Sequence, residues 1–125
     1  MMALSFNRDG SVTMISDYDG STSVVAPGWT PSSLSAAYLA FQTTWPLAFL
    51  QQYQQAGFDA YFDYHFDLKA FIRAGTVATV TAANIGAFLA QITNNYRSIR
   101  AQIFATTSQS QLLAIDWTQG WPSNP

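Results

Sequence analysis

The feature that most limits what this chain can become is a stretch of 39 residues, from Gly20 to Phe58, that carries no charged side chain. Over the whole chain 10% of residues are charged, against roughly 25% in an average soluble domain. All seven acids are Asp, and the bases are Arg8, Lys69, Arg73, Arg97 and Arg100. The surface must therefore consist largely of Ser, Thr, Gln, Asn and Ala.

The length and composition predict one folded domain that spans residues 1–125. Hydrophobic residues make up 49% of the chain, and the 9 Phe, 6 Tyr and 4 Trp can bury large areas in a core. This composition is unlike that of disordered chains, which are poor in aromatics. A net charge of −2 weighs against nucleic acid as a partner. The absence of Cys removes disulfides and thiolate zinc sites.

The chain shows no segment typical of export or of a membrane span. Residues 3–8 have neither a basic region nor an apolar run, so we expect no signal peptide. Leu34 to Leu50 is uncharged, but it is only 17 residues long and Pro46 interrupts it. A bilayer span needs about 20 apolar residues, so we expect no membrane span.

The first 25 residues predict a small β-meander. Leu4–Asn7, Ser11–Ser16 and Ser21–Val25 are short segments of strand character, with Val12 and Met14 alternating against polar residues. The pairs Asp9-Gly10 and Asp19-Gly20 between them favour tight turns. The pattern around Asp17 to Gly20 only partly resembles a calcium loop, since Ala26 stands where the closing Glu is required.

A helix is predicted after this meander, with Thr30 as its N-cap and Pro31 as its first residue. Apolar residues recur at helical spacing as far as Ala56. Pro46 predicts a break near Thr43-Thr44. Gly57 predicts the end of the helix.

The remainder of the chain predicts a hairpin, a second helix and a last strand. Residues 58–73 alternate with period two, which favours a strand over a helix, and 76–80 favours its partner strand. Residues 82–103 show a helical apolar stripe, and 111–117 reads as a strand. The expected fold is therefore α+β, a mostly antiparallel sheet with two helices packed on one face, in the order β-β-(β)-α-β-β-α-β.

Asp63, His65 and Asp67 are the candidate catalytic residues. On a strand they would share one face, where two carboxylates beside an imidazole could bind a metal or orient a general base. The alternative is a solvent-facing strand whose charges protect an edge. No nucleophile elbow or phosphate loop is present, and we expect no cofactor and no metal.

Three aromatic residues are candidate partner contacts. Trp29 and Trp121 lie in Pro/Gly-rich segments, and Tyr53 lies among Gln51, Gln52, Gln54 and Gln55 in what is either a polar helix face or a neutral contact surface. Trp45 and Trp117 lie on apolar stripes and are expected in the core.

Charge is depleted and aromatics are enriched at the centres of protein–protein interfaces. The leading hypothesis is therefore a structural or accessory subunit of a larger assembly, such as a virus particle, with other protein subunits, including copies of itself, as partners. The first alternative is a binding or inhibitor module that docks one protein partner. The second is a small-ligand binder or hydrolase-type enzyme that uses the Asp63, His65 and Asp67 face.

Overall fold

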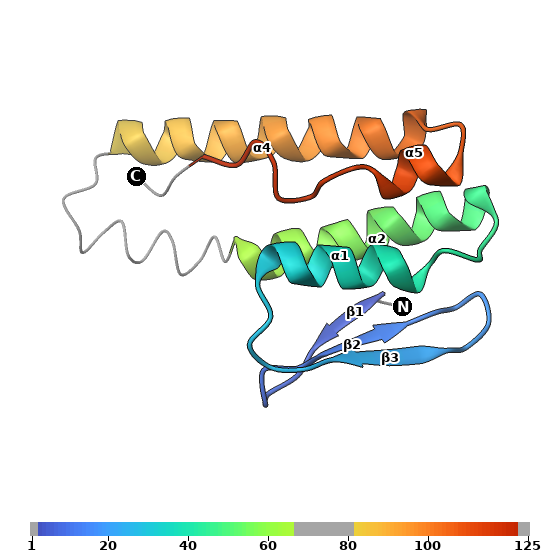
Figure 1. Cartoon of the computed structure of the whole chain (residues 1–125). Coiled ribbons are helices and arrows are strands. Elements are labelled where there is room, and N and C mark those ends of the chain that lie inside the picture. The colour runs from blue at the N-terminus through green and yellow to red at the C-terminus, as the bar shows by residue number, and fades with distance from the viewer. Residues whose placement is uncertain (1–2, 67–81, 123–125) are drawn as a thin grey trace.

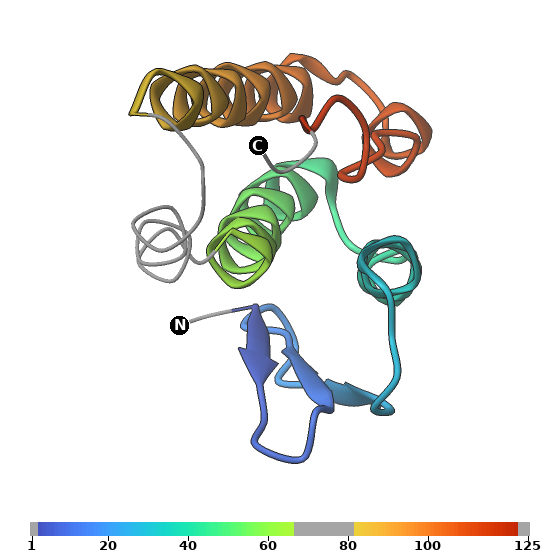
Figure 2. The ribbon, with the colours of Figure 1, turned by 90° about the vertical axis from the view of Figure 1, so that its left-hand side faces the viewer.

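The computed structural model describes residues 3–66 and 82–122. In these ranges the elements are β1 (Leu4–Phe6), β2 (Val12–Ile15), β3 (Thr22–Val25), α1 (Pro31–Phe41), α2 (Leu47–His65), α4 (Ala82–Ala105) and α5 (Gln109–Leu113). Figure 1 shows three layers: the sheet, then α1 and α2, then α4 with α5. The predicted α+β class is confirmed, with all described helices on one side of an antiparallel sheet (Figure 2). α4 packs on α2 rather than on the sheet itself.

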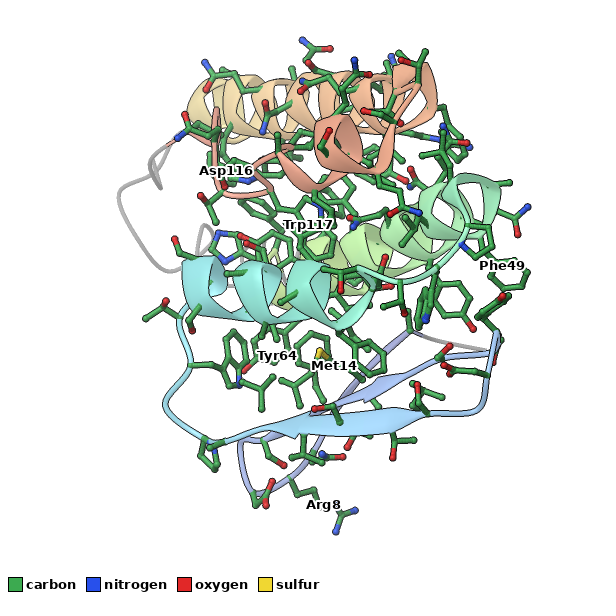
Figure 3. All side chains as sticks on the ribbon, turned by 45° about the vertical axis from the view of Figure 1, so that its right-hand side comes forward. Arg8, Met14, Phe49, Tyr64, Asp116 and Trp117 are labelled. Atoms are coloured by element: carbon green, nitrogen blue, oxygen red, sulfur yellow. The ribbon has the colours of Figure 1, made fainter. Side chains whose placement is uncertain are left out.

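The three strands form an antiparallel sheet in the order β1-β2-β3. Val12 and Met14 point to the core, as their alternation predicts, and Figure 3 shows Met14 directed at the helices. Both predicted Asp-Gly turns are confirmed, since Gly10 has a φ of +90° and Gly20 a φ of +74°. Such backbone angles are open to glycine because it has no β-carbon.

The start of α1 and the break after it follow the prediction. The Ser33 amide donates to Thr30 Oγ1 at 3.1 Å, and the Thr30 amide donates to Ser33 Oγ at 2.8 Å, which completes a capping box. α1 ends at Phe41, and α2 begins at Leu47, directly after Pro46. Proline permits this restart because the first residues of a helix have no N–H partner to lose.

The predicted strand over 58–73 is wrong for its described part, because α2 continues through Gly57 to His65. α2 lies in the middle layer and contacts α1, α4, α5 and β1. A helix enclosed on several sides carries apolar residues on most of its faces and loses the clean stripe of a surface helix. In the described residues, the period-two pattern therefore results from the burial of α2 on several sides. The predicted strand over 76–80 lies outside the described residues.

Residues 82–105 form the predicted second long helix, α4. The predicted strand over 111–117 is wrong: Gln109–Leu113 is a short helix, and the residues after it form turns. Ser108 caps α5, because its hydroxyl accepts from the Gln111 amide. In this segment Leu112, Ile115 and Trp117 are buried, whereas Leu113 is only half-buried.

The core lies around α2. Trp45 and Trp117 are 2% and 0% exposed, which confirms the prediction that both are core residues. The Trp117 ring contacts Tyr38, Phe58 and Tyr61 at centroid distances between 5.2 and 5.9 Å. The C-terminal segment is therefore anchored to both helices of the middle layer.

Candidate functional site

The structure does not place Asp63 and His65 on one face, as the predicted row requires. Asp63 and His65 lie near the end of α2, where successive residues are rotated by about 100°. Residues two apart therefore point to different sides of the helix, and both side chains are exposed. Asp67 lies outside the described residues. Within the ranges 3–66 and 82–122, no group of three or more acidic, His or Cys side chains could hold a metal ion.

His65 belongs to an aromatic cluster instead of a polar site. Its ring stacks on Tyr61 at 5.4 Å with an interplanar angle of 8°, and meets Phe66 edge-on at 4.6 Å. Partial burial lowers the pKa of the imidazole below its ordinary value of 6.5. The ring is therefore uncharged at neutral pH.

Three of the rare carboxylates fasten turns. The Oδ1 atoms of Asp9, Asp19 and Asp116 each accept two hydrogen bonds from the residue two positions later, which is Ser11, Ser21 or Thr118. In each turn the hydroxyl donates at 2.6 Å. These bonds hold the pKa of all three carboxyl groups below the ordinary value. The three groups are thus occupied as turn fasteners, not poised as acids or bases.

A fourth carboxylate, Asp59, joins α2 to α4. It accepts hydrogen bonds from the Tyr96 hydroxyl at 2.5 Å and from the Gln55 side-chain amide at 2.8 Å. Burial and the neighbouring Asp59 raise the pKa of Tyr96. This cluster holds the second and third layers together.

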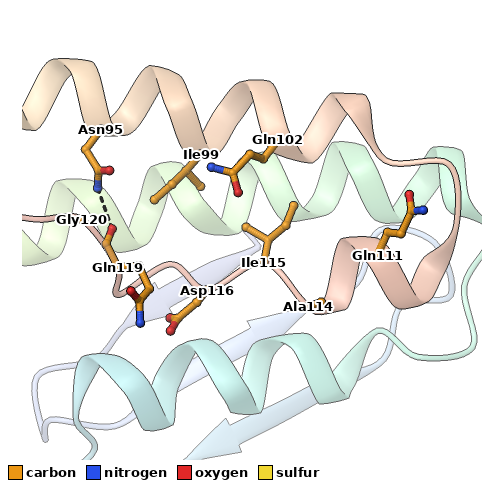
Figure 4. Close-up of a pocket in the computed structure, with 9 residues that line it drawn as sticks. All are labelled: Asn95, Ile99, Gln102, Gln111, Ala114, Ile115, Asp116, Gln119 and Gly120. Carbon is orange, nitrogen blue, oxygen red and sulfur yellow. Dashed lines mark hydrogen bonds between the residues drawn. The ribbon is translucent and has the colours of Figure 1, made fainter.

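A groove lies between α4 on one side and α5 with the segment after it on the other. It has a volume of about 380 Å³. Its walls carry four side-chain amides and one carboxylate over a small apolar floor (Figure 4); the lining residues are Asn95, Ile99, Gln102, Gln111, Ala114, Ile115, Asp116, Gln119 and Gly120. An amide offers both a donor and an acceptor, so the groove suits neutral, hydrogen-bonding ligands.

Asn95 and Gly120 close one end of this groove. The Asn95 amide donates to the carbonyl of Gln119 at 2.9 Å. Gly120 has a φ of +84°, and a β-carbon at this position would overlap the Asn95 side chain. The groove therefore depends on a glycine that sequence reasoning did not single out.

The outer face of the sheet is the second candidate surface. The strand register directs Ser5, Thr13, Ile15, Thr22 and Val24 away from the helices. None of these side chains is charged, and Val24 is 63% exposed. Arg8 lies in the turn at one end of the sheet and extends away from the body (Figure 3). No described helix covers this face (Figure 2).

The predicted partner contacts lie largely within the fold. Trp29 is half-buried against Phe6 and Tyr64, and its indole N–H donates to the Gly10 carbonyl at 2.8 Å. Trp121 packs on Phe66, and its indole N–H donates to the Trp117 carbonyl at 2.6 Å.

Tyr53 is 7% exposed and offers little surface to a partner, because its ring packs between Trp45 and Phe49. Of the Gln residues around it, Gln54 is fully buried and Gln52 is exposed. The Gln51 amide donates to the Thr106 carbonyl at 3.1 Å. The predicted neutral surface around Tyr53 is therefore mostly a set of internal contacts.

Comparisons with protein-family models, with curated proteins and with solved structures find no match for this chain. Among the described residues, none of the helices has the length and apolar character that a bilayer crossing requires.

Proposed function

We propose that this protein is a structural or accessory subunit of a larger protein assembly, of the kind found in virus particles, and acts through protein–protein contacts. The observation that carries the proposal is the outer face of the sheet, which no described helix covers and which presents Thr13, Ile15, Thr22 and Val24 without a charge. Solvent-facing sheet surfaces are ordinarily polar. A neutral face of β-branched residues is suited to burial against another subunit.

The use of the carboxylates supports the same proposal. Of the six Asp side chains that the structure describes, four are hydrogen-bonded within the fold. The other polar groups of the described surface are mostly hydroxyls and amides, which lose little on desolvation when they find partners across an interface.

The test is the mass of the full chain in extracts of its source and after purification, measured by sedimentation over a wide range of concentrations. We expect masses above that of one chain. The double variant Ile15→Glu with Val24→Glu should reduce association by at least tenfold, because it would bury two carboxylates. Ala90→Glu, on the exposed side of α4, is the matched control. A single-chain mass in extracts and at every concentration would overturn the proposal.

The groove beside α4 favours a second candidate, a module that docks one protein partner. The side-chain amides of Gln102, Gln111 and Gln119 can pair with the N–H and C=O groups of an extended peptide. Gln102→Ala with Gln119→Ala would weaken such a complex and leave the association through the sheet face unchanged.

A further inference from the structure

β3 is an edge of the sheet with free backbone groups. The Ser16 amide donates to the Ser21 carbonyl at 2.9 Å. Hydrogen-bonded residues alternate along an antiparallel pair, so the backbone N–H and C=O groups of Ser23 and Val25 also point toward β2. The backbone N–H and C=O of Thr22 and Val24 therefore point away from the sheet. Of the residues that the structure describes, none outside the sheet bonds to these groups.

The edge strand is short, at four residues, but it carries none of the sequence features that usually prevent strand pairing. Besides short length, natural edge strands use Lys, Pro, a bulge or an inward-pointing charge. β3 reads Thr-Ser-Val-Val, pairs with β2 without a bulge, and exposes 63% of Val24. An extended strand is the occupant that such a row of backbone donors and acceptors fits.

We propose that β3 pairs antiparallel with β3 of a second copy of this chain, about a two-fold axis at Ser23, to form one continuous six-stranded sheet. Thr22 would lie opposite Val24 of the second copy, and Val24 opposite its Thr22. These two pairs would form four N–H···O bonds. This inference rests on the proposed function, because the partner is a protein subunit. The partner is a second copy of this chain, and the contact is its β3.

The charges favour this symmetric arrangement. A two-fold axis places like residues near one another, so a charge on the strand would repel its own copy, and β3 has none. Asp17 and Asp19 lie in the turn before β3, whereas the turn at the other end of the sheet carries both Arg8 and Asp9 and therefore no net charge. Antiparallel pairing separates the two acidic turns and places each at the same end as the neutral turn of the other copy.

The neighbouring helix leaves room for a second copy. α1 packs against β3 and lies above that side of the sheet (Figure 2). Its exposed positions, Ser32, Ser33, Ala36 and Ala40, are small and uncharged. Backbone hydrogen bonds contribute little net stability by themselves, so the proposed interface also includes contact between the two α1 helices.

The experiment is sedimentation equilibrium of the full chain and three variants. Val24→Pro removes an outward N–H that β2 does not use, and Val24→Lys places a charge at the edge without the constraint of proline. Ala90→Lys puts the same charge on the exposed side of α4, away from the sheet, and is the matched control. Circular dichroism establishes that each variant is folded.

We expect a dimer that both Val24 variants weaken at least tenfold and that Ala90→Lys preserves. A purified chain that stays monomeric overturns the self-pairing, and so does a dimer that neither Val24 variant weakens. If extracts then still contain assemblies, only the β3 pairing has failed; if they contain the single chain alone, the proposed function has failed as well. The pure chain could also be monomeric and yet form a complex with another protein in extracts. If Val24→Pro abolishes that complex, β3 pairs with a strand of the other protein and not with a second copy.

Discussion

The ring of Tyr38 lies against Gly57 in the space that a β-carbon would otherwise occupy. The contact joins α1 to the middle of α2, and the Tyr38 hydroxyl donates to the Tyr53 carbonyl at 2.5 Å. Burial raises the pKa of Tyr38 well above its ordinary value. Gly57 therefore serves close helix packing and does not end the helix, although glycine is a poor helix former.

Gly57→Ala is expected to destabilise the protein by about 1–3 kcal/mol, because the added carbon overlaps the Tyr38 ring. Gly86→Ala, in α4, is the matched control, since a β-carbon at Gly86 would meet nothing within 4 Å. That change should stabilise the protein by about 0.5–1 kcal/mol. Urea denaturation of the two variants measures both effects. Equal stabilisation by both would show that Tyr38 does not occupy the space beside Gly57.

The Asp-fastened turns predict a loss of stability in acid. The folded-state pKa values of Asp9, Asp19 and Asp116 lie below the ordinary 3.8. The stabilisation is therefore complete above pH 3.8 and is lost as the pH falls through the lowered values. Urea midpoints measured from neutral pH to below pH 3.8 should decline in this range.

The triple variant Asp9→Asn, Asp19→Asn and Asp116→Asn should flatten this decline. Asp63→Asn should leave it unchanged, because the Asp63 carboxylate accepts no hydrogen bond from the described residues. An unchanged slope in the triple variant would contradict the role assigned to these turns.

His65 predicts a second pH effect with its own window. Its folded pKa lies below 6.5, so the unfolded chain binds the proton first as the pH falls. Stability is therefore complete above pH 6.5 and is lost as the pH falls through the folded value. Because the chain has one His, its imidazole resonances in an NMR titration report this pKa directly. A value at or above 6.5 would place the ring outside the aromatic cluster.

Two Gln residues of α2, one fully buried and one partly exposed, predict opposite effects of the same substitution. Gln54 is fully buried, and neither polar atom of its amide has a hydrogen-bond partner in the described structure. Gln54→Met keeps the volume and removes the unpaired groups, so it should stabilise the protein by about 1–3 kcal/mol. Gln51→Met removes the bond to Thr106 and should destabilise it by about 1 kcal/mol. Destabilisation by Gln54→Met in denaturant titrations would indicate bound water at this amide.

Elements with one buried face were predictable from the sequence. Alternation at Val12 and Met14 located β2, and Thr30-Pro31 located the start of α1. The continuation of α2 beyond Gly57 was not predictable from periodicity, because an enclosed helix buries residues on most sides. α5 was missed although Ser108 is an N-cap residue, since its single turn is too short for a periodic pattern.

The candidate surfaces were less predictable than the fold. The groove combines residues 95–102 with residues 111–120, and no local pattern relates these two segments. The Asp-fastened turns did have a visible signal, because a Ser or Thr stands two positions after Asp9, Asp19 and Asp116. The candidate row at Asp63 and His65 was predicted from a strand, whereas both residues lie in a helix.

All of the described helices lie on one side of the sheet, and no described element packs on its opposite side. A neighbouring subunit that packs there would turn the sheet into an interior layer. Thr13 and Ile15 would then exchange water for side-chain packing, and the chain would gain a second core that it shares with that neighbour.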